Sequence, residues 1–589
     1  MDLTSGGWGF VLCSWIVASD NGSNPADRYT STFSPVQSVV TDWSDWGVQF
    51  ALPDTLNRRM DITLARGVPL VWTTCSGVNP TINIGASPLY DTNGAAITLT
   101  NGGSFVATAF SLDYQGRSFG VFVPDNTTFS VGSGSVTAQL AGTNNYLVYG
   151  VLPARANLNE FASYAYARFT GTAFNWTYDR TNGQIDTAWS VIANPLKGSQ
   201  TNTLQGWLPH HYRMPQNSLA FKPYTYLTPR GVMRVAAGNQ FELDYSFRGL
   251  APVLPAPQTN GLPNDYVASR MPNYLVNFAA GNPYNVGDSY GAGKEMGISA
   301  QYLSFARQMG MTNQAAQLAA GLRGILTNWY TYTPGETGYF FAQYADWRAL
   351  IGFPPGYGSE AFNDNHFHYG YFMVATALLG MEDTNFLSQF GPMAKLVAKE
   401  YANWDRSDTN IPFLRTFDIW EGHSWAGGFS TGGGENQESS SEAMNSWVGL
   451  FLAGNMLGDD AMTAAGAMGY AIESAAVNEY WQDMYRSNLP TSYGKGTVGV
   501  LWSGALAYGT YFSGDPAWIY GIQWVPANHW NNYLARDTAF ANWQLTNLWA
   551  ERITASENGS GGFTLNDANN PSSAGRLPGQ LCSWFSEPV

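Results

Sequence analysis

The first third of the chain alternates apolar and polar residues in short runs. Clusters of Gly, Asn, Asp and Pro separate these runs, which lie at 47–52, 60–65, 96–100, 117–123 and 146–152. A period of two is typical of strands that bury one face, and runs so closely spaced are joined by short turns. The pattern therefore predicts an antiparallel β-sandwich over residues 1–172.

The pattern becomes helical after residue 256. Apolar residues then recur at three- and four-residue spacing in segments at 293–309, 313–329, 369–380, 387–403, 435–456, 460–484 and 537–553. This spacing predicts amphipathic helices, and helices without coiled-coil heptads must pack around a common core. We therefore predict a helical toroid or bundle over 257–589. Residues 173–256 show no clear period and end in a proline-rich run, which indicates a boundary.

The composition is more typical of a secreted protein that handles sugars than of a cytosolic protein. Charged residues make up 12% of the chain, against about 25% in ordinary soluble proteins, and aromatic residues make up 15%. The 43 acidic and 28 basic residues give a net charge of −15, which repels polyanions. We therefore expect no nucleic acid or membrane partner. No apolar run approaches the ~18 residues of a membrane helix, and we expect a secreted protein.

The cysteines and the first residues add little chemistry. Cys13, Cys75 and Cys582 have no metal-ligand spacing and cannot form a disulfide framework. No P-loop, dinucleotide-binding turn or nucleophile elbow is present, so we expect no cofactor. The apolar stretch at 9–18 has no Lys or Arg before it, which favours a strand over a signal peptide.

The first candidate site is the motif NDNHFHYGYF at 363–372, in which Asp364 is surrounded by rings. A carboxyl group packed among rings loses hydration, so its pKa rises and it can act as a general acid. Two alternatives stay open. Asp364 could cap the following helix, or Asp364, His366 and His368 could bind a metal ion from one face of an extended segment.

The second candidate is GGGENQESSSEA at 432–443. Glu435, Glu438 and Glu442 are spaced to lie on one face of a helix, where their charges repel unless a cleft or ligand uses them. The helix dipole near this end favours an ionised carboxylate, which suits a general base. The alternative is structural, because Ser439 and Glu442 match a capping box.

The third candidate is FDIWEGHSWAGG at 417–428, which mixes acids, indoles and a histidine. The indole of Trp425 can stack on a sugar ring, while Asp418 and His423 can bond its hydroxyl groups. A buried aromatic loop is the alternative.

These three motifs, in this order, resemble glycoside hydrolase family 81, the endo-β-1,3-glucanase or laminarinase family. Supporting similarities are WLPHHYR at 207–213, DSYGAGKEM at 288–296 and WIYGIQWVP at 518–526. The resemblance implies an N-terminal β-sandwich, a small α/β linking domain at 173–256 and a C-terminal (α/α)6 barrel at 257–589. It also implies inverting, metal-independent hydrolysis of β-1,3-glucans such as laminarin and cell-wall glucan.

The resemblance further implies roles for single residues. Asp364 corresponds to the general acid, and we assign Glu442 as the general base with Glu438 as its neighbour in substrate binding or pKa tuning. Substrate-binding roles are expected for residues of the same motifs: His366, His368, Tyr369, Tyr371, Asp418, His423, Trp425 and Glu435. An inverting pair of carboxyl groups lies ~6.5–9.5 Å apart, with the attacking water between them.

The expected partner is β-1,3-glucan, bound by a monomer. The chain starts in what resembles the middle of the sandwich, so we expect leading strands and a signal to be missing. Three rival readings remain: a non-catalytic β-glucan-binding protein, a metal-dependent hydrolase, and a polysaccharide lyase. The low basic content suits a neutral glucan better than the anionic uronates that lyases cleave.

Overall fold

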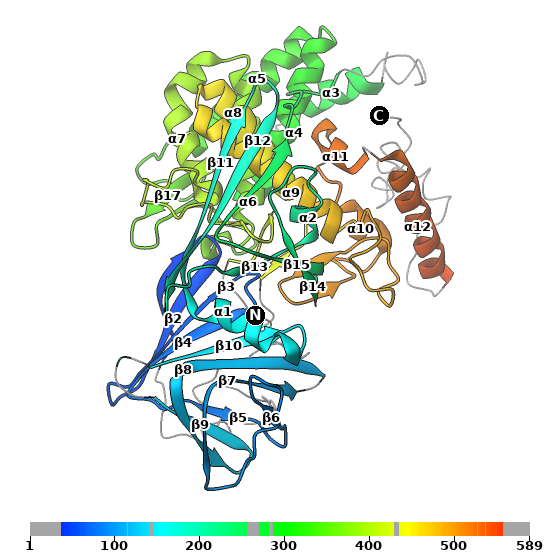
Figure 1. Cartoon of the computed structure of the whole chain (residues 1–589). Coiled ribbons are helices and arrows are strands. Elements are labelled where there is room, and N and C mark those ends of the chain that lie inside the picture. The colour runs from blue at the N-terminus through cyan, green and yellow to red at the C-terminus, as the bar shows by residue number, and fades with distance from the viewer. Residues whose placement is uncertain are drawn as a thin grey trace. The chain divides into compact units, whose positions relative to one another are not determined.

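A computed structural model describes residues 37–114, 116–140, 143, 145–255, 270–281, 287–428, 435–526, 528–535 and 537–557 (Figure 1). The strand predicted at 9–18, together with Cys13 and Cys582, lies outside these residues. The chain forms two compact units. One comprises Met1–Trp176 and Asp186–Asp244, and the other Thr177–Ile185 and Tyr245–Val589.

The first unit contains a ten-stranded antiparallel sheet with the order β1-β2-β3-β4-β10-β8-β7-β6, in which β9 pairs with β8 and with β5. Its strands are β1 (Val39–Ser44), β2 (Gly47–Pro53), β3 (Arg59–Ala65), β4 (Leu70–Ser76), β5 (Thr81–Asn83), β6 (Leu89–Tyr90), β7 (Ser104–Tyr114), β8 (Arg117–Gly132), β9 (Ser135–Gln139) and β10 (Tyr146–Leu152). The predicted antiparallel β region is thus confirmed. The strand predicted at 96–100 is wrong, because the carboxylate of Asp91 turns the chain there and only Ala96 forms an isolated bridge.

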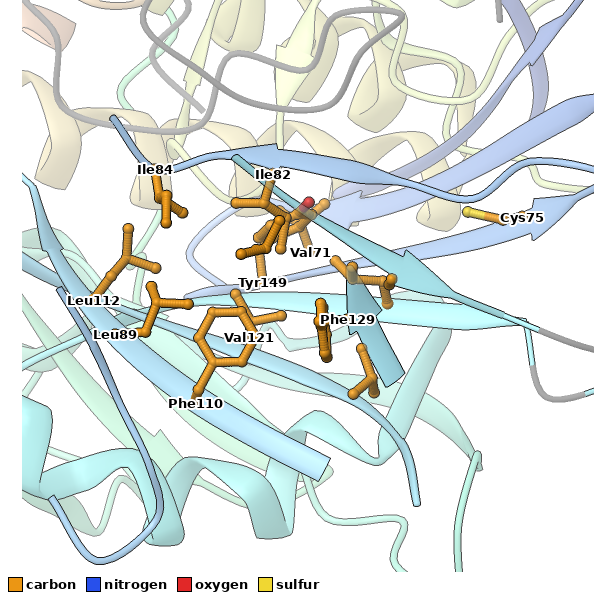
Figure 2. Close-up of a cluster of buried hydrophobic side chains, with 14 of the residues drawn as sticks. Val71, Cys75, Ile82, Ile84, Leu89, Phe110, Leu112, Val121, Phe129 and Tyr149 are labelled. Carbon is orange, nitrogen blue, oxygen red and sulfur yellow. The ribbon is translucent and has the colours of Figure 1, made fainter. Parts of the chain in front are cut away.

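The core of this sheet is a cluster of buried aliphatic and aromatic side chains (Figure 2). Alternate residues of the strands supply it, as the period-two pattern requires. Phe129 stacks on Phe105 at 5.1 Å between ring centroids and meets the edge of Phe110 at 5.2 Å. Cys75 is buried as a free thiol in the same cluster.

Helix α1 (Leu158–Ala165) leads into two smaller sheets of three strands, β11-β12-β16 and β13-β15-β14. Their elements are β11 (Ala167–Asp179), β12 (Gln184–Pro195), β13 (Leu204–Trp207), α2 (Pro209–Tyr212), β14 (Phe221–Thr228), β15 (Gly231–Ala237) and β16 (Gln240–Ser246). The tip of the β11–β12 hairpin, Thr177–Ile185, belongs to the second unit. The domain boundaries expected at 172 and 256 stay predictions.

The rest of the second unit is mainly helical, as predicted. Its helices are α3 (Met271–Ala280), α4 (Ser289–Gln308), α5 (Thr312–Trp329), α6 (Asn365–Gly380), α7 (Thr384–Ala402), α8 (Ser440–Leu457), α9 (Asp460–Tyr480), α10 (Pro516–Gly521), α11 (Asn532–Ala535) and α12 (Thr538–Glu557). Helix α6 is buried along its whole length and packs against both α4 and α8. Closure into an (α/α)6 barrel stays a prediction. Within the described ranges, no helix is both long and apolar enough to cross a bilayer.

Three small sheets interrupt the helices: β17 (Phe340–Tyr344) with β18 (Ala349–Phe353), β19 (Phe417–Asp418) with β20 (His423–Ser424), and the three strands β21 (Asn436–Gln437), β22 (Val500–Trp502) and β23 (Leu506–Ala507). One of them corrects a prediction. The helix expected at 435–456 begins only at Ser440, because Asn436 and Gln437 pair with β22. Gln523 then accepts hydrogen bonds from the backbone N–H and the hydroxyl of Ser440, which fixes where the helix starts.

Candidate active site

A cavity of about 1180 Å³ opens along α4, beside the N-terminal halves of α6 and α8 and the loops next to them. Its wall includes all three carboxyl groups with predicted catalytic roles, Asp364, Glu438 and Glu442. Aromatic side chains line it densely: Tyr290, Tyr302, Phe305, Tyr357, Phe367, Tyr371, Tyr511, Phe512, Trp518 and Trp530. The cavity thus combines acids with flat rings, which suits a sugar chain.

Asp364 stands immediately before α6 in a left-handed backbone conformation, with φ of 59°. Such a φ is uncommon outside glycine and marks a constrained position. Its backbone N–H donates to the carbonyl of Ala426 at 2.9 Å, and its carboxyl accepts from the Asn363 side chain at 2.9 Å. Asp364 is the N-cap residue of α6, but its carboxyl group makes no capping hydrogen bond to the helix, so the alternative of a side-chain cap is wrong. It lines the cavity instead.

The surroundings of Asp364 favour its protonated form. Burial, reinforced by the charges of Glu442 and then Glu438, raises the pKa of Asp364 to about 8. Removal of water from a carboxyl group penalises its charged form, and nearby carboxylates add repulsion. At neutral pH this group can therefore donate a proton, as a general acid must.

Glu442 lies in the first turn of α8 and is buried. The hydroxyl groups of Tyr290 and Tyr371 donate to its Oε1 at 2.8 Å and 2.7 Å. The ammonium group of Lys294 donates to the Tyr290 hydroxyl at 3.3 Å, which brings a positive charge close to the side chain of Glu442. The predicted capping box is wrong, because Ser439 makes no side-chain cap and its hydroxyl turns to the carbonyl of Ile522.

Glu438 lies outside the helix, two residues before α8. Its Oε1 accepts the backbone N–H of Tyr511 at 2.7 Å. Burial and the neighbouring charge of Glu442 raise the pKa of Glu438, while the hydrogen bond from Tyr511 opposes that rise. The prediction that Glu435, Glu438 and Glu442 share a helical face is wrong, since β21 occupies the intervening residues. Glu438 and Glu442 nevertheless reach the same cavity.

Two of the residues with predicted substrate-binding roles, His368 and Tyr371, line the cavity. The ring of His368 packs against Tyr290, and its Nδ1 lies 2.8 Å from the hydroxyl of Ser289. Burial lowers the pKa of His368 to about 3, so the ring is neutral at ordinary pH. These two side chains therefore offer hydroxyl and imidazole contacts without charge.

The other residues with predicted binding roles are not among those that line the cavity: His366, Tyr369, Asp418, His423, Trp425 and Glu435. Tyr369 is buried, and its hydroxyl bonds to the backbone of β18. Trp425 donates its indole N–H to Asp418 at 3.2 Å. These contacts hold the loops in place, and the binding roles of the six residues stay predictions.

The two histidines of the first motif do not converge with Asp364 as metal ligands. His366 is buried, and its Nε2 lies 3.1 Å from the side-chain amide of Gln437, while the Nδ1 of His368 faces Ser289. In the part of the chain that the structure describes, no group of three His, Cys, Asp or Glu side chains is arranged to hold a metal ion.

Several cavity residues lie outside the three motifs that predict the site. Tyr290 and Lys294 belong to DSYGAGKEM, which supports the family resemblance but by itself predicts no site residue. Asn445 follows Glu442 by three residues on α8, the spacing that places two side chains on one helical face. Its buried Nδ2 finds no acceptor within the described ranges, so it offers a donor to a ligand in the cavity.

The glycines after Ala426 allow close backbone approach beside Asp364. A methyl group on Gly428 would come 1.8 Å from the carbonyl oxygen of Ala361 and 2.6 Å from the amide nitrogen of Asn363. Such overlaps with backbone atoms cannot be relieved by a side-chain rotation. Gly428 is therefore required where the third motif passes the segment that holds Asp364.

We expect Gly428→Ala to displace the Asp364 segment and to lower the free energy of unfolding by about 1–3 kcal/mol. Thermal melting and activity against laminarin test this, with a larger loss expected in activity. Gly324→Ala is the matched control, because a methyl group at Gly324 on α5 meets no atom within 4 Å. Equal effects of the two substitutions would contradict the close-approach argument.

Comparison with known proteins identifies the family. A model of the glycosyl hydrolase family 81 C-terminal domain matches residues 275–574, which include every carboxyl group of the cavity. The chain belongs to glycoside hydrolase family 81. A family 81 glycoside hydrolase from Clostridium thermocellum, solved as a Glu-to-Ala mutant, has a TM-score of 0.82 and 30% identity, over 89% of this chain and 71% of that one.

Curated relatives of this family 81 chain are named glucan endo-1,3-β-D-glucosidase. One from Acetivibrio thermocellus is 33% identical over 486 residues, which is 81% of this chain and 60% of the relative. One from Thermobifida fusca is 30% identical over 512 residues, which is 85% of this chain and 64% of the relative. The chain therefore spans about three fifths of the length of these relatives.

Proposed function

We propose that this chain hydrolyses β-1,3-glucosidic bonds within β-1,3-glucan chains, with inversion at the anomeric carbon. One observation carries the proposal: Asp364, whose pKa is raised to about 8, and Glu442, held by two tyrosine hydroxyl groups, line the same cavity. The names of the family 81 relatives supply the substrate class.

In this mechanism Asp364 is the general acid. It transfers its proton to the glycosidic oxygen as the bond from that oxygen to the anomeric carbon breaks. Glu442 takes a proton from a water molecule on the opposite face of the sugar, and the water oxygen bonds to the anomeric carbon. An inverting pair lies ~6.5–9.5 Å apart so that this water fits between them.

The hydrogen bonds of Glu442 support its assignment as the base. Both tyrosine hydroxyl groups donate to Oε1, and no described residue donates to Oε2, which is therefore available to a water molecule. One carboxyl oxygen of Glu438 accepts the backbone N–H of Tyr511, and the charge of Glu438 contributes to the raised pKa of Asp364. A role of Glu438 in substrate binding or in raising that pKa therefore fits better than the role of base.

The cavity wall suits a neutral polysaccharide. Aromatic rings offer flat apolar surfaces to the C–H faces of glucose, and side chains such as Asn445 offer hydrogen bonds to its hydroxyl groups. The net charge of −15 disfavours anionic polymers. We further propose that the protein is secreted and acts as a monomer on laminarin and cell-wall glucan.

Release of reducing sugars from laminarin tests the proposal. Hydrolysis with a mixture of oligosaccharide products is expected for an enzyme that cuts within the chain. Binding of laminarin without any release of reducing ends would favour a non-catalytic glucan-binding protein instead. Loss of activity with a chelator, restored by a divalent ion, would favour a metal-dependent hydrolase.

The stereochemistry of the first product tests the mechanism separately. Proton NMR during the earliest turnover is expected to show the α-anomer at the new reducing end, because water attacks the face opposite the leaving group. Mutarotation sets the time limit, so spectra must be taken within minutes. A β-anomer formed first would mean a covalent intermediate and would overturn the inverting assignment.

A further inference from the structure

A fully buried carboxyl group outside the cavity wall bonds to two segments of the candidate site. Glu473 is on α9, and its side chain accepts three hydrogen bonds. The backbone N–H of Ser424 donates to Oε1 at 3.0 Å, and the hydroxyl of Ser424 donates to Oε2 at 2.8 Å. The indole N–H of Trp447, on α8, also donates to Oε2, at 2.7 Å.

These bonds connect two parts of the candidate site. Ser424 begins a short segment that we call the bridge, residues 424–428, whereas Trp447 lies five residues after Glu442 on the same helix. Two short bonds to Ser424 and one to Trp447 therefore hold the bridge against the helix that carries the proposed base. Burial of a carboxyl group is costly, and this set of donors offsets much of that cost.

The bridge in turn holds the segment of the proposed acid. The carbonyl of Ala426 accepts the backbone N–H of Asp364 at 2.9 Å, and the N–H of Ala426 donates to the carbonyl of Asn436 at 2.8 Å. Asn436 lies two residues before Glu438. One residue of the bridge thus links the strand that leads to Glu438 with the residue that carries the acid.

From these contacts we propose that Glu473 is a positioning residue, which sets the location of Asp364 relative to Glu442 through the bridge. This assignment rests on the proposed function and adds to it a residue outside the cavity. Glu473 contacts no substrate, because the described cavity wall does not include it. Its effect on turnover comes from holding the two carboxyl groups at the distance that the water needs.

Glu473→Gln tests the assignment, because glutamine keeps the shape but offers only one acceptor oxygen to the three donors. We expect kcat on laminarin to fall by about 10–100-fold, as small misplacements of catalytic groups do. The KM is expected to change less than about threefold, since the cavity wall is untouched. Ser424→Ala removes the hydroxyl bond and keeps the backbone bond, so it is expected to give a smaller fall in kcat.

A control substitution in the same helix distinguishes a positioning role of Glu473 from a purely structural one. Met462→Ala truncates a fully buried side chain eleven residues before Glu473, about 16 Å along α9. It is expected to lower the melting temperature at least as much as Glu473→Gln while leaving kcat close to that of the wild type. If both variants lose stability and kcat in the same proportion, Glu473 is a core residue only and the assignment is overturned.

The pH profile gives a second readout. If the bridge moves and Asp364 gains water, its pKa falls, and the basic limb of the kcat/KM profile shifts to lower pH in Glu473→Gln. The ionisable groups that line the cavity around Asp364 are Tyr290, Lys294, Tyr302, Tyr357, His368, Tyr371, Glu438, Glu442 and Tyr511. The variant also removes Glu473, whose pKa burial raises to about 7, but the charges that raise the pKa of Asp364 are those of Glu442 and Glu438, so a shift of the limb reports on position.

The two proposals fail in different ways. A wild-type chain that releases no reducing sugar from laminarin overturns the proposed function and this assignment with it. An active wild type, together with a folded Glu473→Gln variant that keeps its kcat and its basic limb, overturns the assignment alone. If Glu473→Gln does not fold, Ser424→Ala tests the assignment in its place. An unchanged kcat in Ser424→Ala would then overturn the positioning role of Glu473.

Discussion

Asp364→Asn is expected to lower kcat for laminarin hydrolysis by about 10²–10⁴-fold, the contribution typical of a positioned general acid. Asparagine keeps the shape of the side chain and its hydrogen bond with Asn363 but cannot donate a proton to the glycosidic oxygen. The KM is expected to change little. Steady-state kinetics on laminarin measure both constants, and retention of more than about a tenth of the activity would remove Asp364 from the role of acid.

The same substitution is expected to stabilise the fold, which separates lost chemistry from lost structure. The pKa of Asp364 is about 8 in the folded chain, against 3.8 for an ordinary aspartate such as that of the unfolded chain. Between these two pH values the folded state therefore binds more protons than the unfolded state. The free energy of unfolding of the wild type therefore falls as the pH rises from about 4 to 8. The Asp364→Asn variant lacks this contribution because an asparagine side chain does not titrate. We expect the melting temperature of Asp364→Asn to exceed that of the wild type at pH 8 and to match it near pH 4.

Glu442→Gln is expected to lower kcat by a similar ~10²–10⁴-fold, because an amide cannot take a proton from water. Its carbonyl oxygen can still accept from Tyr290 and Tyr371, so the fold is retained. Removal of this charge also lowers the pKa of Asp364, since repulsion from Glu442 contributes to the rise. The basic limb of any residual activity is therefore expected at lower pH than in the wild type.

Glu438→Gln is the matched control for this prediction. It changes an acid on the same cavity wall whose Oε1 is bonded to the backbone of Tyr511. We expect a smaller loss of kcat than in Glu442→Gln, with the effect seen partly in KM. If Glu438→Gln instead lowers kcat more than Glu442→Gln does, the role of base belongs to Glu438.

The fold classes of the two halves were predictable because they rest on local periodicity. The runs at 47–52 and 146–152 form strands β2 and β10, and α9 covers most of the segment 460–484. These segments carry their apolar residues at the spacing that their own element buries. The run at 96–100 has the same local pattern, but after the turn at Asp91 it contacts β6 only through the bridge at Ala96 and the hydrogen bond from the Ile97 N–H to the Leu89 carbonyl.

The site was predictable only as far as its motifs are contiguous. Asp364 and Glu442 were identified, but the helix start at Ser440 depends on Gln523, and the pairing of Gln437 depends on β22. Both partners are more than sixty residues away, so the spacing of the glutamates could not reveal the break. Glu473 lies in an ordinary helical pattern, and only its buried contacts with Ser424 and Trp447 distinguish it.

The most direct test of this account is a crystal structure of Glu442→Gln with a bound β-1,3-glucan hexasaccharide. We predict that the sugar lies in the cavity, with the carboxyl group of Asp364 within hydrogen-bonding distance of a glycosidic oxygen. The side chain at 442 should face the other side of the sugar, ~6.5–9.5 Å from Asp364, with room for one water. A glucan bound elsewhere, or the two side chains only ~5–5.5 Å apart, would contradict the inverting mechanism.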